Sequence, residues 1–366
     1  MRAAQVQGFG GPEMLVPVDL PDPVPGRGEV LIEVAYADTI FVETQLRTGW
    51  GREYFPTTPP YVPGGGVSGV VAAVGPDVDG AWLGRRVVSH VTGSYASKAT
   101  AAVTSLTPVP AGLDLLTAAA LVHDGVTATG LLDLTAVTAD DQVLVLGASG
   151  GMGTLLVQLA RSRGARVTAL ARGAEKLALV RELGATAAVD ITGADWPERV
   201  REAMGGDGAR EAMGRNEARE AMGRNEAREA LGGDGPRQAM GRNEAREAMG
   251  VDGADVVLDG VGGQLGATAL ALTADGGRFS AHGAPTGGFA TVDTAEAERR
   301  GIRVLGIGDV QFGSAEVRRL MARALDEAAA GRLRVVIGAV FPVERAGEAH
   351  ARIEGRGVVG KVVLEV

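Results

Sequence analysis

Residues 142–153 read QVLVLGASGGMG. The apolar run at 143–146 is typical of a buried strand, and glycines at 147, 150, 151 and 153 follow it. The next segment, TLLVQLARSRGA at 154–165, has the spacing of an amphipathic helix that ends at Gly164. Glycines in such a turn let the backbone approach a pyrophosphate closely, and the helix N-terminus offers it free N–H groups. The segment therefore predicts a dinucleotide-binding turn, with an ordinary strand–helix turn as the alternative.

The alternation of strands and helices continues after this turn. Strand-like segments are ARVTALA at 165–171, DVVLDGV at 255–261, GGRFSAHG at 276–283 and IRVLGIG at 302–308, and EKLALVRELGA at 175–185 is helix-like. Such alternation indicates a parallel sheet with right-handed crossovers. We expect an α/β domain with a doubly wound (Rossmann) sheet over residues 114–308.

The N-terminal part of the chain has a different pattern. Residues 1–113 contain segments rich in Val and Ile, separated by segments rich in Pro and Gly; examples are EVLIEVAYAD at 29–38, GVSGVVAAVG at 66–75 and GRRVVSHV at 84–91. This pattern predicts a β-rich domain. The tail at 309–366 is mixed, with a helix expected at 315–331 and strands at 333–341 and 360–366.

Composition excludes several classes of protein. The 366 residues suffice for two domains, and no apolar run approaches the ~20 residues of a membrane span. The N-terminus shows no secretory signal pattern, so a cytoplasmic protein is expected. A net charge of −9 argues against a nucleic-acid binder. With no cysteine, thiolate catalysis and Cys-based metal sites are excluded, and His90, His123, His282 and His350 show no metal-binding spacing, so no metal is predicted.

The end of the second strand of the α/β domain bears on the choice of cofactor. An NAD-dependent enzyme places Asp or Glu there to bind the ribose hydroxyls. Here the sequence is ALARGAEK, with Arg172 at that place and Lys176 one helical turn later. These cations attract a 2′-phosphate, which favours NADPH over NADH. The alternative is that both are solvated surface cations.

Taken together and in order, these motifs identify a family resemblance. The chain resembles the zinc-independent quinone oxidoreductase (zeta-crystallin-like) branch of the medium-chain dehydrogenase/reductases. The segments that carry the resemblance are PDPVPGRGEVLIEV, PYVPGGGVSGVVAAVG, GRRVV, GASGGMG, EKLALVRELGA, VLDGVGG and FPVERAGEAHARIEGRGVVGKVVLEV. The resemblance implies a GroES-like catalytic domain at 1–113, completed by 309–366, beside the Rossmann NADPH-binding domain. It also implies hydride transfer from NADPH to a quinone, an enone or a related small-molecule carbonyl, and a homodimer.

The resemblance also implies roles for individual residues. The cofactor contacts it implies, in addition to Arg172, are Thr127, Gly147, Ala148, Ser149, Gly150, Gly151, Met152, Gly153, Lys176, Gly262, His282, Gly283 and Ala284. Departures from the family pattern occur at Asp38, Thr39 and Ile40, at Gly66, and at Ile191, where relatives often have Tyr.

The catalytic side is less well defined by the sequence. The candidates by position are His123, Asp124, Tyr54 and Tyr61. A histidine at position 123 can donate a proton to a carbonyl or relay one, and the alternative is that it packs or caps a helix. For the two tyrosines, a role as walls of the site is the alternative to a role as acids. A second functional class also stays open: an NADPH-binding structural or regulatory protein that acts through partner contact.

A near-perfect nine-residue repeat runs six times over residues 201–254, with REAMGRNEA as its typical unit. It lies between a helix and a strand of the predicted Rossmann domain, so we expect an insertion at about 205–249. Good helix formers and turn-like GGDG segments predict two exposed helices, at about 209–231 and 236–249, although glycine in each unit opposes a helix. A frayed loop is the alternative. A neutral origin by duplication and a selected partner-binding role both stay open.

Overall fold

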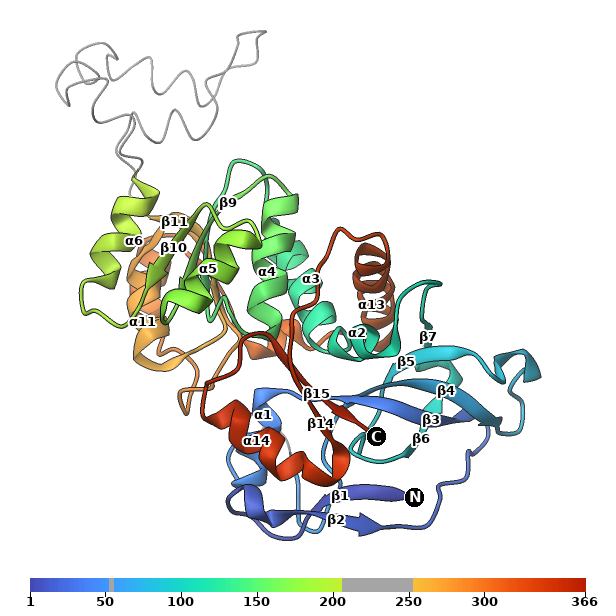
Figure 1. Ribbon diagram of the computed structural model, residues 1–366. Helices are drawn as coiled ribbons and strands as arrows, with labels where there is room; N and C mark the ends of the chain where they lie inside the picture. The colour runs from blue at the N-terminus through green and yellow to red at the C-terminus, as the bar shows by residue number, and fades with distance from the viewer. Residues whose placement is uncertain (53–55, 206–252) are drawn as a thin grey trace, which may run out of the picture. The chain divides into compact units, whose positions relative to one another are not determined.

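The structure is a computed structural model that describes residues 1–52, 56–205 and 253–366 (Figure 1). The predicted site residue Tyr54 and the two predicted helices of the repeat insertion lie outside the described residues. The chain divides into two compact units. Unit 1 comprises residues 1–131, 149–159 and 309–366, and unit 2 comprises residues 132–148 and 160–308. The domain boundaries expected from the sequence stay a prediction.

Unit 2 contains the parallel sheet. Its strands are β8 (Gln142–Leu146), β9 (Arg166–Ala171), β10 (Ala187–Asp190), β11 (Ala254–Asp259), β12 (Thr273–Ala281) and β13 (Arg303–Leu305). They lie in the order β10-β9-β8-β11-β12-β13, and all neighbouring pairs are parallel. This is the strand order of a Rossmann sheet. The order in which successive strands are added to the sheet reverses between β8 and β11. The α/β fold predicted from the sequence is confirmed.

The central strand β8 is fully buried along its length, as expected for a parallel strand covered on both faces. Helices between the strands are α5 (Ala174–Glu182), α6 (Trp196–Met204), α11 (Gly263–Ala271) and α12 (Thr294–Arg299). The apolar sides of α6, α11 and α12 pack with the strands into one cluster that includes Leu144, Leu170, Trp196 and Phe279. This core fixes the strand ends at which the glycine turn begins.

Unit 1 contains a seven-stranded sheet and a separate two-stranded sheet. The strands of the larger sheet are β3 (Glu29–Asp38), β4 (Gly66–Val74), β5 (Arg86–His90), β6 (Lys98–Ala102), β7 (Thr107–Pro108), β14 (Ile337–Pro342) and β15 (Lys361–Glu365). They lie in the order β14-β15-β3-β4-β5-β7, and β6 also pairs with β3. The smaller sheet joins β1 (Arg2–Val6) to β2 (Leu15–Asp19). Residues 29–38, predicted as a strand, are confirmed as β3.

The two ends of the chain meet in this sheet. The C-terminal strand β15 runs antiparallel to β3 and pairs Val363 with Asp38, and the red and blue strands lie side by side in Figure 1. The helices of this part are α1 (Phe41–Arg47), α2 (Leu115–Ala120), α3 (Asp124–Leu134), α4 (Gly151–Ser162), α13 (Ser314–Ala329) and α14 (Ala346–Glu354). Short 3₁₀ turns occur at Pro12–Met14, Gly80–Trp82, Val103–Ser105, Ile307–Val310 and Val343–Arg345.

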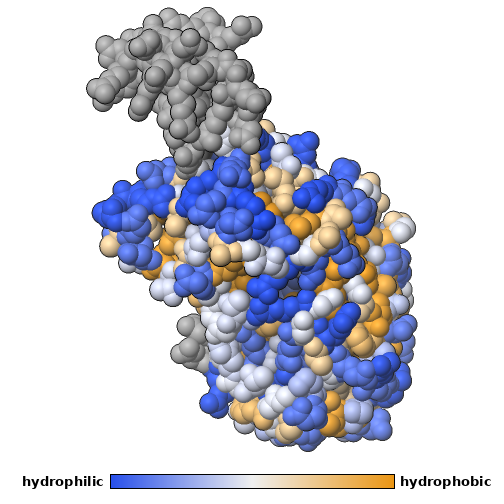
Figure 2. Space-filling model, turned by 60° about the vertical axis from the view of Figure 1, so that its left-hand side comes forward, coloured by the Kyte–Doolittle hydropathy of each residue, from blue (hydrophilic) through white to orange (hydrophobic). Residues whose placement is uncertain are grey.

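The surface carries few large exposed apolar side chains. Among the described residues they are Phe9, Val24, Leu83 and Val340, and the face shown in Figure 2 interleaves hydrophobic with hydrophilic areas. In the described part of the chain, none of the helices combines the length and the apolar character needed to cross a membrane.

Candidate functional site

The glycine turn joins β8 to α4. Helix α4 begins at Gly151, three residues before the helix expected from the sequence, so the last glycines of the turn belong to its first turn. Only Gly147 in this turn has a left-handed backbone, with φ of 68°, a conformation that glycine adopts without strain. A Cβ atom there would lie 3.1 Å from Val261 Cγ2, so the turn also passes close to the end of β11.

The second half of the turn is held by the C-terminal segment of unit 1. The Gly360 N–H donates a 2.8 Å hydrogen bond to the carbonyl of Ser149, and Gly150 and Gly360 form an isolated β-bridge. A Cβ atom on Gly151 would lie 2.3 Å from Asp124 Oδ2 and 2.9 Å from Lys361 Cδ. Two charged side chains therefore pack directly against the first turn of α4, and only glycine leaves them room.

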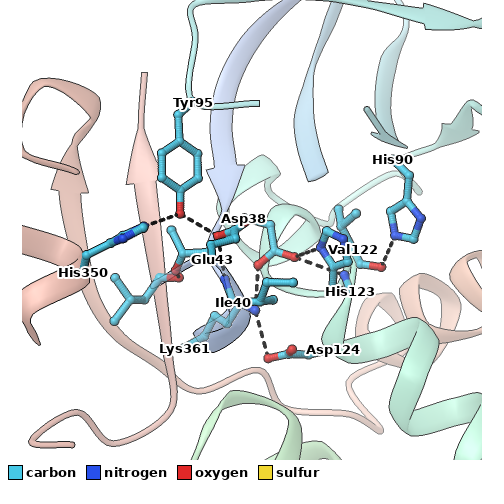
Figure 3. Close-up of polar contacts among 12 residues, drawn as sticks. Asp38, Ile40, Glu43, His90, Tyr95, Val122, His123, Asp124, His350 and Lys361 are labelled. Atoms are coloured by element: carbon cyan, nitrogen blue, oxygen red, sulfur yellow. Dashed lines mark hydrogen bonds and ion pairs between the residues drawn. The ribbon is translucent and has the colours of Figure 1, made fainter. Parts of the chain in front are cut away.

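Asp38, at the end of β3, is the centre of a buried ionic cluster (Figure 3). Its side chain is fully buried; Oδ1 lies 2.6 Å from Lys361 Nζ and Oδ2 lies 2.6 Å from His123 Nδ1. The same Oδ2 accepts a 3.1 Å hydrogen bond from the backbone N–H of His123. Burial alone would raise the pKa of the Asp38 carboxyl, but Lys361 and His123 hold it below its usual value. Asp38 is thus a carboxylate.

Lys361 connects this carboxylate to a second one. Its ammonium lies 3.0 Å from Asp124 Oδ2, and its side chain is 5% exposed. Burial alone would lower the pKa of Lys361, but Asp124 and Asp38 together raise it above its ordinary value. The pKa of Asp124 is raised, chiefly by burial. The lysine therefore stays charged and fixes both aspartates, because a buried carboxylate needs a partner.

His123 is the most exposed member of this cluster. Its side chain is 23% exposed, whereas that of Asp38 is fully buried. Burial lowers the pKa of His123, but the hydrogen bond to Asp38 and the negative charges of Asp38 and Glu43 together outweigh burial and raise it. Since Asp38 is a carboxylate, Nδ1 carries a proton, and in the described part of the chain the structure gives Nε2 no hydrogen-bond partner. A Cβ atom on Gly65 would lie 2.9 Å from Nε2, so the glycine leaves space beside that atom.

His90 stacks on His123. The ring centroids are 4.5 Å apart and the planes differ by 17°, and His90 Nε2 lies 3.0 Å from the carbonyl oxygen of Val122. Burial, together with the charge of His123, lowers the pKa of His90 to about 4. His90 is therefore a neutral ring that fixes the plane of its neighbour.

A second polar network lies behind the cluster, also in unit 1. The Tyr95 hydroxyl donates to Glu43 Oε2 at 2.6 Å and lies 3.0 Å from His350 Nε2. Arg47 contacts His350 Nδ1 at 3.4 Å and pairs with Glu354. Burial raises the pKa of Glu43 to about 7 and lowers that of His350 to about 3. His350 lies in the interior.

The predicted residues at the strand ends of unit 2 pack closely. His282 follows β12, is 6% exposed, and has its Nδ1 3.1 Å from Ser280 Oγ; burial lowers its pKa to about 4. A Cβ atom on Gly262 would lie 2.3 Å from the Gly288 carbonyl oxygen, and one on Gly283 would lie 2.1 Å from the Gly260 carbonyl carbon. Ala284 is buried beside them. Only small residues fit at these positions.

The remaining predicted residues fall in three places. Arg172 is exposed just after β9, and Lys176 is half-buried in α5. Thr127 lies in α3, where its N–H bonds to the His123 carbonyl. Tyr61 pairs with Val6 through the backbone, and its ring packs against an apolar cluster that contains Tyr95. Their roles at a site stay predictions, as does the absence of a metal site; the described residues contain no group of three potential metal ligands.

Sequence reasoning missed Lys361 and the partner role of Asp38 in the ionic cluster, and Glu43, Tyr95 and Arg47 in the network behind it. Asp38 was noted only as a departure from the family pattern. A weak signal existed, because Asp38 ends the apolar strand EVLIEVAYAD and Lys361 begins the apolar strand KVVLEV. Charged residues at the ends of buried strands need partners, but their 323-residue separation hides which ones pair.

Comparison with known proteins supplies family matches over most of the chain. The alcohol dehydrogenase GroES-like domain family matches residues 26–130, and two zinc-binding dehydrogenase families match residues 151–222 and 234–364. Quinone oxidoreductase from Mus musculus is 40% identical over 176 residues, and that of Homo sapiens is 38% identical over the same length. These matches cover 47% of this chain, and the chain spans about half the length of these curated relatives.

Solved structures extend the similarity to the full length. A mycobacterial protein in complex with NADPH is 30% identical, with a TM-score of 0.81 and 100% of both chains covered. A mycobacterial quinone oxidoreductase is also 30% identical, with a TM-score of 0.75 and the same coverage. The Escherichia coli quinone oxidoreductase in complex with NADPH has a TM-score of 0.81 over the full length of both chains at 22% identity, which supports the fold alone.

Proposed function

From the premise that this chain belongs to the quinone oxidoreductase branch of the medium-chain dehydrogenase/reductase superfamily, we propose that it is an NADPH-dependent reductase. It transfers a hydride to a quinone or an α,β-unsaturated carbonyl, without a metal ion. The observation that carries this proposal is the glycine turn from Gly147 to Gly153. The turn follows β8, the strand at which the strand order of the Rossmann sheet reverses. Ligands of such sheets bind at the carboxyl ends of the strands at this point.

The residues of the turn suit a pyrophosphate. The left-handed Gly147 turns the chain sharply after β8, and the first N–H groups of α4 have no partners earlier in that helix. A dinucleotide bound there gains hydrogen bonds from these N–H groups and a favourable interaction with the helix dipole. When bound, NADPH supplies the hydride, and the protein residues hold and orient it.

Two cationic side chains are the basis for proposing NADPH over NADH as the cofactor. Arg172 follows β9, at the place where NAD-dependent relatives of this fold carry an acid, and Lys176 lies in the first turns of the following helix. Arg172 is exposed, so its guanidinium is free to reorient toward a 2′-phosphate.

The test is direct. Purified protein is titrated with NADPH and NADH by fluorescence, and absorbance of the reduced nicotinamide is then followed with a panel of quinones, enones and ketones. Tight NADPH binding with turnover of one class supports the proposal. If NADPH binds and no acceptor on the panel is reduced, the reductase function is wrong and a structural or regulatory role takes its place.

We also propose a homodimer that pairs through β13 (Arg303–Leu305). This strand is one edge of the six-stranded sheet, and an edge strand exposes unpaired N–H and C=O groups that a second copy can bind. Size-exclusion chromatography with light scattering of the wild-type chain tests it: we expect the mass of a dimer, and the mass of a monomer contradicts the proposal.

A further inference from the structure

We propose that His123 donates the proton that completes the reduction, that Asp38 and Lys361 position it, and that the substrate is an α,β-unsaturated carbonyl instead of a quinone. The proposal rests on the proposed function for the source of the hydride. It goes further in naming the acid, its supporting residues and the class of acceptor. All three residues belong to unit 1.

The two carboxylate oxygens of Asp38 bind different partners. Oδ1 contacts Lys361 Nζ and Oδ2 contacts His123 Nδ1, each at 2.6 Å. Lys361 is itself held by Asp124 at 3.0 Å, so the carboxylate is fixed in place. A carboxylate bonded to Nδ1 sets both the tautomer and the plane of the imidazole. Stacking on His90 fixes the plane from one face.

His123 Nε2 has no hydrogen-bond partner among the described residues. A fully buried ring nitrogen is expected to find a partner inside the protein, whereas a nitrogen of a partly exposed ring can also bind a ligand or solvent. Here Nδ1 is bonded, the ring is partly exposed, and the space beside Nε2 is kept open by Gly65. A Cβ atom at Gly66 would lie 2.6 Å from Val122 Cγ1, so this neighbouring glycine is also required by packing next to His123. The geometry presents Nε2 to a ligand.

Several ionisable groups surround the ring of His123. The groups that face His123 are the carboxylate of Asp38, the carboxyls of Asp124 and Glu43, the ammonium of Lys361 and the neutral ring of His90. Asp38 and Asp124, when ionised, bring two negative charges against the single positive charge of Lys361. An imidazolium at His123 balances the remaining charge. The cluster therefore favours the protonated, donating form of His123.

Proton transfer from His123 accompanies hydride transfer. A hydride, released with its two electrons when a C–H bond of bound NADPH breaks, would form a C–H bond at the β-carbon of the enone, and the electrons of the C=C and C=O π bonds would move toward the carbonyl oxygen. The His123 Nε2–H bond breaks and its proton goes to that oxygen. The products are the oxidised cofactor, a neutral imidazole and an enol that tautomerises in water to the saturated carbonyl. The partly exposed ring then takes a proton from water.

The presence of a positioned acid indicates which class of acceptor the site reduces. An enone accepts a hydride poorly unless its carbonyl oxygen receives a proton or a strong hydrogen bond, and a positioned acid typically contributes ~10²–10⁴-fold. A quinone is a much stronger acceptor, and its product is a phenolate, whose conjugate acid has a pKa of about 10, close to that of tyrosine. Reduction of a quinone therefore needs little help from an acid. The His123–Asp38 pair therefore fits enone reduction.

The experiment compares acceptors and variants in the full chain. Cyclohexenone and a benzoquinone are reduced with NADPH by wild type, His123→Gln and Asp38→Asn, with NADPH affinity and melting temperature measured on each. We expect both variants to bind NADPH and stay folded. We expect the ratio of enone to quinone kcat/KM to fall about 100-fold or more in His123→Gln, and about 10-fold in Asp38→Asn. An unchanged ratio, or a wild type that reduces the quinone only, overturns the proposal.

A second readout needs no turnover. The chain has four histidines, so ¹H–¹³C spectra of the ring carbons follow each one against pH. We expect one signal, absent in His123→Gln, to titrate above the usual histidine range and to move down in Asp38→Asn. The same pKa must govern the wild-type pH profile of kcat for the enone, with activity falling as pH rises. If the pH profile of kcat does not follow this pKa, His123 is a packing residue and the proposal is wrong. If no acceptor is turned over at all, the proposed function is wrong instead.

Discussion

The Tyr95 hydroxyl donates a 2.6 Å hydrogen bond to Glu43 Oε2 in the interior of unit 1. The Ile40 N–H donates to the same oxygen at 2.9 Å, and the Glu43 side chain is only 5% exposed. These two donors favour the carboxylate, yet burial outweighs them and raises the pKa of Glu43 to about 7. Glu43 thus ionises near neutral pH in the folded chain and near its ordinary pKa of 4.5 in the unfolded one.

This difference predicts how stability depends on pH. Between pH 4.5 and about 7 the unfolded chain loses the Glu43 proton and the folded chain keeps it, so Glu43 reduces the free energy of unfolding as pH rises through this range. The loss amounts to roughly 3 kcal/mol at most, at about 1.4 kcal/mol per pH unit. Urea unfolding of wild type and Glu43→Gln at pH 5 and pH 8 checks this prediction. We expect the free energy of unfolding of Glu43→Gln minus that of wild type to be larger at pH 8 than at pH 5. An equal difference at both pH values contradicts the prediction.

Gly65 gives a test of the space beside His123. In Gly65→Ala the new Cβ would lie 2.9 Å from Nε2 and 3.0 Å from Cε1, so the ring or the backbone must move. We expect kcat for the enone to fall about 10-fold or more, because a misplaced acid loses its geometry, while NADPH affinity is retained. Gly80→Ala is the matched control, since a Cβ atom there meets nothing within 4 Å. Equal effects of the two substitutions on kcat would contradict this role for Gly65.

The sequence predicted the fold well because its signals are local. The strand and glycine turn at 142–153 fix the start of the parallel sheet, and β3 matches the predicted 29–38. The boundaries were less accurate: α4 starts at Gly151 because glycines of the turn adopt helical geometry, which composition alone does not reveal. Glycine positions and apolar periodicity determine the backbone conformation of a few neighbouring residues. They can therefore be recognised in a single sequence.

The candidate site was less predictable because its contacts are distant in the sequence. His123 and Asp124 were identified by position, but their partners come from β3 and from the start of β15. Only the pairing of β15 with β3 brings Lys361 to Asp38. The orientation of the His123 ring depends on Asp38, His90 and Gly65 together, and no local motif encodes that combination.

Cofactor selectivity is predicted to depend on Arg172 and Lys176. Neutralising both, in Arg172→Gln/Lys176→Gln, removes charge that favours a 2′-phosphate and leaves NADH binding unaffected. We expect the ratio of NADPH to NADH affinity to fall about 10-fold or more, measured by fluorescence titration at low salt. Arg318→Gln, an exposed cation in α13, is the control and leaves the ratio unchanged. If the double variant keeps the wild-type ratio, both residues are surface cations and another group selects the cofactor.

Lys361 is predicted to be far more important for stability than a surface lysine in a similar ion pair. Lys361→Met leaves the buried Asp38 and Asp124 without their cation, and breaking a buried pair by removing one partner typically costs about 3–5 kcal/mol. Lys98→Met, which removes a more exposed pair with Asp22, is the control and costs about 1 kcal/mol or less. Urea unfolding at pH 7 compares the two variants. Comparable losses would mean that Asp38 and Asp124 take up protons when Lys361 is gone, and Lys361→Met would then recover stability at pH 5 relative to wild type.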